Sequence, residues 1–174
     1  MEFHLENSIT LLQVTPAVLH SWLAQLPRDW ILSNEGADTW SPFDVVGHLV
    51  HGEKTDWIPR AEIILSGSEN KQFEPFDRFA MFTESQGKSI QDLLSEFEEL
   101  RRLNIERLRS MQITEVDLDK TGQHPDLGEV TLRQLISTWV AHDLDHIGQI
   151  AGIMARQYKG EVGPWQNYLG ILDE

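Results

Sequence analysis

The sequence predicts an all-α fold, specifically a four-helix bundle. Apolar residues recur at helical spacing in four stretches, and three of these stretches open with a recognisable helix-start signal. No stretch shows the alternation of a strand followed by an Asn-Gly or Asp-Gly turn. Amphipathic helices of this kind bury their apolar stripes against one another, so a bundle follows.

The first predicted helix begins at Thr15 and ends near Pro27. Thr15 can cap free backbone amides. Pro16 suits the first helical position because the amide hydrogen that proline lacks would have no partner there. Residues 5–14 are expected to add a turn before this helix.

The second predicted helix begins at Ser41 and reaches about Leu65. The Ser41 hydroxyl can cap free amides, and the acidic Asp44 suits the positive end of the helix. Pro59 is expected to introduce a kink or an early end, and Gly67 is expected to terminate the helix.

The third predicted helix spans about 89–111, and the fourth runs from Thr131 to about Tyr158. In the third, the arginine and glutamate residues are expected on the face opposite the apolar stripe. In the fourth, Thr131 and Gln134 form a capping box, which makes this helix the best specified of the four. The long connections 67–88 and 112–130 are either functional covers or segments that only close the ends of the bundle.

The length of 174 residues predicts one domain spanning 1–174. The absence of cysteine excludes a disulfide framework, a thiolate nucleophile and a cysteine-ligated metal site, so a tight metal site must use histidine and carboxylate. A formal net charge of −14 argues against nucleic acid as a partner, because a polyphosphate requires a basic surface. With no membrane-length apolar run and no secretory signal in the sequence, we expect no membrane partner and a cytoplasmic location.

Two histidines of the fourth helix, His142 and His146, are four residues apart and can therefore face one metal ion. Spacing alone is weak evidence, because seven histidines give roughly a one-in-four chance of such a pair. On a helical wheel, His146 lies inside the apolar arc and His142 at its edge, so both are expected to point into the bundle. Metal ligands and ordinary hydrogen-bonded histidines both fit this pattern.

Two carboxylates also fall on buried arcs. Asp143 lies in the middle of the fourth helix's apolar arc and Glu53 near the centre of the second helix's arc, so each needs a buried partner. Gln149 lies one turn past His146 on the same flank and can bind either an imidazole nitrogen or a substrate.

A third metal ligand must come from elsewhere in the bundle, because two histidines leave a metal undercoordinated. The second helix offers His48 and His51, and the neighbours of His48 mildly favour it as the inward residue without deciding the choice. His4, His20 and His124 are interpreted as structural or solvated residues.

Two motif segments occur in this order along the chain, and the pattern that they delimit spans most of it. The first is Trp40-Ser41-Pro42 followed by His48-Leu49 and Glu53. The second runs from Asp117-Leu118-Asp119 through Thr121-Gly122, His124-Pro125 and Gly128-Glu129-Val130-Thr131-Leu132 to His142-Asp143, His146 and Gln149-Ile150. Both segments resemble the DinB/YfiT-like superfamily of bacterial four-helix proteins.

The resemblance implies an up-down-down-up bundle, a homodimer, and a divalent metal held by three histidines. The ligand positions of the family fall on His48, His142 and His146, whereas His51 matches none. Zinc and nickel are the expected metals. Known members include thiol S-transferases and isomerases that use low-molecular-weight thiols.

We therefore expect a divalent-metal-binding protein, and more specifically a metal-dependent enzyme with a small-molecule substrate. The reaction would use metal-activated water, as in a hydrolase, or a low-molecular-weight thiol cosubstrate, as in an S-transferase. Asp143 and Glu53 are candidates to orient imidazoles or relay protons, and the alternative for each is pairing with an arginine, a tryptophan or the backbone. The alternative functions are a noncatalytic metal- or ligand-binding dimer in a stress response and a purely structural bundle.

Overall fold

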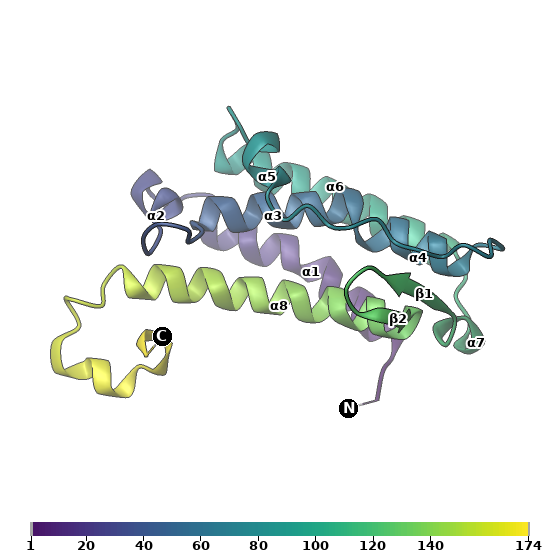
Figure 1. The fold of residues 1–174 in the computed structure, drawn as a ribbon. Coiled ribbons are helices and arrows are strands. Elements are labelled where there is room, and N and C mark those ends of the chain that lie inside the picture. Colours follow the sequence, from purple (N-terminus) through teal and green to yellow (C-terminus); the bar gives the residue numbers. More distant parts are fainter. Residues whose placement is uncertain (1, 174) are drawn as a thin grey trace.

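In the computed structural model, which describes residues 2–173, four long helical segments form the bundle (Figure 1). They are α1 (Leu5–Leu23), α3 (Pro42–Thr55) continued by α4 (Trp57–Leu65), α6 (Ile90–Ser110) and α8 (Leu132–Arg156). The short elements are α2 (Arg28–Leu32), α5 (Ala80–Glu84), α7 (Glu115–Leu118), strands β1 (Thr121–His124) and β2 (Gly128–Thr131), and the 3-10 helices η1 (Gly163–Tyr168) and η2 (Gly170–Leu172). Among residues 2–173, no helix is both long and apolar enough to cross a membrane.

The order of the helices in space differs from their order in sequence. α1 packs on α6 and α8, and α3 packs on the same two helices, so α1 and α3 occupy opposite corners. α1 and α8 run in one direction, whereas α3 and α6 run in the other (Figure 1). Because α3 and α6 are parallel, the connection 66–79 returns along the length of the bundle. The four-helix bundle and its up-down-down-up order are therefore confirmed.

The first helix was predicted from Thr15, with residues 5–14 adding a turn before it, whereas α1 is one continuous helix from Leu5. Pro16 lies inside this helix and has no amide hydrogen to donate to the carbonyl of Leu12. The Nη1 atom of Arg101 donates to that carbonyl instead, over 2.8 Å. A partner from α6 thus satisfies the acceptor that the proline leaves free, and the helix continues through it.

The second helical segment breaks at Asp56, between α3 and α4. Pro59 cannot donate to the carbonyl of Thr55 one turn earlier, so a hydrogen bond that would bridge the break is missing. The predicted kink is confirmed and lies just before the proline. At the start of α3, Ser41 and Asp44 form a reciprocal capping box.

A short hairpin of β1 and β2 lies in the segment 121–131, where no strand was predicted, so that prediction was wrong. The strands have four residues each, which is too short for a recognisable alternation. Gln123 of β1 also pairs with the connection 66–79: the amide of Phe73 donates to its carbonyl over 2.9 Å, and its amide donates to the carbonyl of Lys71 over 2.8 Å. Gly122 permits this approach, because a Cβ there would lie 2.5 Å from the Phe73 ring.

Two apolar clusters fill the bundle. One includes residues from the first half of α1, α4, the end of α6 and the start of α8, and the other includes residues from the second half of α1, α3, the start of α6 and the end of α8. Between the two clusters, α3, α6 and α8 each place a buried charged residue, namely Glu53, Arg101 and Asp143. The core is thus divided by a polar layer, and the candidate site lies at this level.

Candidate metal centre

Three imidazoles meet between α3 and α8. The Nε2 atom of His142 lies 3.1 Å from Nε2 of His48 and 3.0 Å from Nε2 of His146. Histidine nitrogens bind zinc at about 2.0–2.1 Å, so nitrogens that share one tetrahedral ion are roughly 3.3 Å apart. The ligand atoms of all three residues lie within 4.8 Å of one another. The donor set and its spacing therefore fit a single metal ion.

The hydrogen bond of His146 fixes which of its nitrogens carries the proton. Its Nδ1 atom lies 2.7 Å from Oε1 of Gln149. An amide oxygen only accepts hydrogen bonds, so Nδ1 carries the hydrogen and the neutral ring presents a lone pair at Nε2. Of the two roles that the sequence left open for Gln149, the structure shows the contact with an imidazole nitrogen.

All three histidines are held in the neutral form. Burial lowers the pKa of His48 and of His142 to about 3, and the charge that neighbouring histidines would carry adds to this effect. Burial also lowers the pKa of His146. Neutral imidazole is the form that binds metal, so the cluster is ready to do so at neutral pH.

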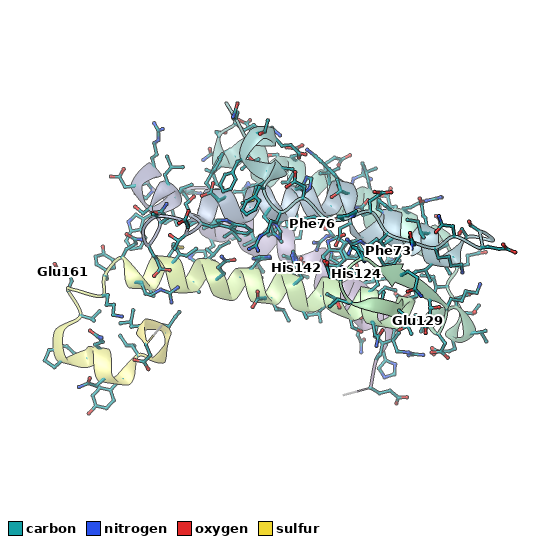
Figure 2. All side chains as sticks on the ribbon, viewed as in Figure 1. Phe73, Phe76, His124, Glu129, His142 and Glu161 are labelled. Atoms are coloured by element: carbon teal, nitrogen blue, oxygen red, sulfur yellow. The ribbon has the colours of Figure 1, made fainter. Side chains whose placement is uncertain are left out.

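Aromatic side chains surround the imidazoles. The Trp40 ring lies 4.9 Å from the His48 ring, the Phe76 ring 5.4 Å from His48, and the Trp57 ring 5.1 Å from His142. Phe76 comes from the connection 66–79 and His142 from α8, and Figure 2 shows them on facing sides of the site. These contacts restrict the rotation of the rings and replace water around them.

The cluster lies in the wall of a cavity of about 720 Å³. Both long connections contribute to this wall, with Phe76 and Arg78 from 66–79 and with His124 and Leu127 from the hairpin. The connections therefore do more than close the ends of the bundle. His124, interpreted from the sequence as structural or solvated, lines the cavity, and its Nδ1 accepts the amide of Asp126 over 3.1 Å.

The choice between His48 and His51 is made by the structure. His51 lies outside the cluster, and its Nδ1 atom is 3.0 Å from Oε1 of Glu84 on α5. His51 is buried by this contact and by the Phe76 ring, 5.0 Å away. Its burial in the same helix as His48 explains why the pattern of apolar residues did not separate them.

The buried partner of Asp143 and Glu53 is Arg101. Its Nη1 and Nη2 atoms donate to the two oxygens of Asp143 over 2.6 and 2.9 Å, and Nη2 also donates to Oε1 of Glu53 over 2.9 Å. Arg101 was expected on the outer face of α6 and is 1% exposed, so that expectation was wrong. A signal for it exists, because Arg101 continues the apolar stripe of α6 at three- and four-residue spacing, with Leu94, Phe97, Ile105 and Leu108.

Further donors complete this ionic network. Nε1 of Trp139 donates to Oε1 of Glu53 over 2.9 Å, and the Asn104 amide donates to Oε2 over 2.9 Å. Burial raises the pKa of Glu53, whereas Arg101 and Asn104 act in the opposite direction and favour the carboxylate.

Neither carboxylate of this network is hydrogen-bonded to a cluster imidazole within residues 2–173. The geometry therefore favours the alternative in which Asp143 and Glu53 pair with arginine and tryptophan. The ionic network still contacts the site indirectly. Trp139, which donates to Glu53, stacks on Trp57 at 5.7 Å, and Trp57 contacts His142.

The fold and the site together define a class: a four-helix bundle with parallel middle segments and three histidines facing a cavity. The chain belongs to the DinB superfamily, whose family model matches residues 11–150. No curated protein matches the chain.

Two solved structures from Bacillus subtilis are similar to the chain. YfiT, described as a probable metal-dependent hydrolase with an unusual four-helix bundle topology, has 21% sequence identity and a TM-score of 0.75, with 90% of each chain covered. A DinB-like protein, YjoA, has 16% identity and a TM-score of 0.55, with 87% of this chain and 92% of that chain covered. At these identities the two structures establish the shared fold.

Proposed function

We propose that the protein is a metal-dependent enzyme in which His48, His142 and His146 hold one divalent transition metal, zinc or nickel. The convergence of three neutral imidazole nitrogens supports this proposal. The description of YfiT, a protein of the same fold, as a probable metal-dependent hydrolase points in the same direction.

The observation that favours an enzyme over a storage protein is the cavity beside the cluster. Catalytic zinc sites have three protein ligands and an open position, whereas structural sites are closed by a fourth ligand. Within residues 2–173 the metal-ligating group contains these three histidines and no fourth ligand, and it faces about 720 Å³ of space. A cavity of this volume suits a small-molecule substrate.

The bound metal would lower the pKa of a water molecule or stabilise a thiolate, which gives a hydrolase or a thiol S-transferase, respectively. The chain has no cysteine, so a thiol would have to come from a low-molecular-weight cosubstrate. Gln149 keeps the proton on Nδ1 of His146 and leaves Nε2 free as a ligand. Trp40 and Phe76 hold water away from the protein side of the imidazoles.

We also propose that the protein forms a homodimer through a face shared by α1 and α8. Four exposed apolar side chains lie there: Leu11, Val14, Val18 and Leu144. They line one groove between α1 and α8, where the one ionisable lining residue is Asp143, which is buried and paired with Arg101. A contact between two copies through this groove would bury apolar surface without bringing exposed acidic side chains of the groove together, in a chain with a net charge of −14.

The test of the enzymatic proposal uses the metal-free protein loaded separately with zinc and with nickel. Each form is assayed for hydrolysis of an ester and amide panel and for transfer of simple thiols to an electrophile. We expect turnover that a chelator abolishes and that His142→Ala lacks, while His20→Ala, a change at an exposed histidine of α1, retains it. Stoichiometric metal with no turnover and no binding of added azide or thiol would favour the noncatalytic alternative.

A further inference from the structure

The cavity wall contains three arginines that differ in their partners. Nε of Arg60 lies 2.7 Å from Oδ1 of Asp56, and Nη2 of Arg156 lies 2.8 Å from Oε2 of Glu35. Arg78 has no carboxylate within ion-pair distance in the part of the chain that the structure describes. Acidic residues outnumber basic ones two to one in this protein, yet among the arginines of the described cavity wall Arg78 lacks such a partner while the other two have one.

Aromatic rings position the Arg78 side chain instead. Its guanidinium carbon lies 5.9 Å from the centre of the Trp40 ring and 5.5 Å from that of Phe79. A guanidinium packed over rings is attracted by their faces, while its N–H groups point outward in its own plane. These N–H groups form a fork that matches the two oxygens of a carboxylate.

The same tryptophan connects Arg78 to the metal centre. Trp40 contacts Arg78 and also packs on His48 at 4.9 Å. Arg78, Trp40 and His48 all line the same cavity. The guanidinium and the metal ligands thus lie on the same part of the cavity wall.

We infer that Arg78 binds a carboxylate group of the substrate or thiol cosubstrate while the three-histidine centre acts on another part of the same molecule. This inference rests on the proposed function. A carboxylate fits better than a phosphate, because one guanidinium matches one negative charge and the cavity wall also includes the acidic residue Asp38. A phosphate dianion would place two negative charges on the single guanidinium of Arg78, close to a wall that already includes Asp38.

Calorimetric titration of the full-length, zinc-loaded protein tests the inference. The probes are ω-mercaptoalkanoates of increasing length and the ω-mercaptoalkanols of the same length, which differ only in the carboxylate. We expect the best carboxylate to bind about tenfold more tightly than its alcohol. Arg78→Gln should remove this preference and leave the alcohol's affinity unchanged, whereas Arg78→Lys should retain part of it, because lysine keeps the charge without the fork.

Two further variants test the effect of charge in the cavity wall and the loss of an arginine elsewhere. Asp38→Asn should increase the affinity for the carboxylate probes, because it removes a negative charge from the cavity wall. Arg28→Gln is the matched control, since Arg28 is an exposed arginine of α2 outside this cavity, and it should keep the full preference.

Three results would each overturn the inference. They are equal affinities for carboxylate and alcohol, a preference that survives in Arg78→Gln, and no binding of any carboxylate. Failure of the proposed function is recognised separately, by titrating zinc into the metal-free protein. If zinc does not bind, the metal centre itself is wrong. If zinc binds and the carboxylate preference is absent, only the role of Arg78 is wrong.

Discussion

The imidazoles of His48 and His142 are neutral because they are buried, and this determines how the metal-free protein responds to pH. Their pKa values are about 3 in the folded state, against the ordinary value of 6.5 that applies when the chain unfolds. Between these values the unfolded chain binds more protons than the folded one, so the free energy of unfolding falls as the pH is lowered from 7 toward 3.

We therefore expect the melting temperature of the metal-free protein to fall between pH 7 and pH 5. In the double variant His48→Asn/His142→Asn the fall should be smaller, because the two titrating groups are gone. The measurement is thermal unfolding of both proteins in chelator at each pH. Parallel curves for the two proteins would show that these histidines are not the buried neutral groups described.

The hydrogen bond from His146 to Gln149 predicts a loss of metal affinity when it is removed. Gln149→Leu deprives Nδ1 of its acceptor, so the tautomer with a free Nε2 is no longer favoured. We expect the affinity for zinc to fall about tenfold or more in competition titrations with a chelator of known affinity. Gln86→Leu, at an exposed position away from the cluster, should bind zinc as the native protein does.

Individual site residues differed in how far the sequence could predict them. His142 and His146 were identified by their spacing on an amphipathic helix, and the burial of Asp143 and Glu53 by their position in the apolar arcs. His48 and His51 are both buried, so periodicity could not separate them. Cavity residues such as Arg78 come from irregular connections, whose path depends on tertiary contacts that no periodic pattern encodes.

At the level of elements, the proline in α1 and the buried arginine in α6 are structurally linked. Pro16 frees the Leu12 carbonyl, and Arg101 uses it together with the carboxylates of Glu53 and Asp143, so one side chain connects all four long segments. The sequence predicted the long helices well, because each has a strong apolar stripe. It failed at the start of α1, because the internal proline is tolerated through Arg101, which donates to the Leu12 carbonyl from 89 positions further along the chain.

Arg101→Met is expected to destabilise the fold strongly. The substitution leaves Asp143 and Glu53 buried without their cation, a change that costs about 3–5 kcal/mol in buried ion pairs. Arg102→Met is the matched control, because Arg102 is 51% exposed and its change should alter the free energy of unfolding by less than about 0.5 kcal/mol. Urea unfolding measures both, and similar values for the two variants would contradict the role given to Arg101.

For the whole molecule, the fold class was predictable from four amphipathic stretches, whereas the direction of each helix was not. Helical periodicity is the same in either direction, and the up-down-down-up order entered through the family resemblance. The physical counterpart of that order is the long connection 66–79, which returns the chain so that α3 and α6 run parallel. The same connection covers the three-histidine cluster, so topology and site depend on one segment.

The proposed dimer predicts that a charge on the α1/α8 face separates the two copies. Val14 is 49% exposed there, and Val14→Asp should convert the dimer to a monomer, because the new carboxylate would be buried opposite its own copy. Val116→Asp, at a valine that is 77% exposed on α7, should leave the dimer intact. Light scattering coupled to size-exclusion chromatography measures the masses. A native protein of monomeric mass would contradict the proposed interface.

The claim that three histidines hold a metal is tested most directly by elemental analysis of protein purified without a histidine tag or chelator. The native chain is compared with the triple variant His48→Ala/His142→Ala/His146→Ala, with circular dichroism as a check on its helicity. We predict about one zinc or nickel ion per chain in the native protein and none in the folded triple variant. Equal metal content in both proteins would contradict the account. So would a native protein that contains no metal and shows no thermal shift when zinc or nickel is added.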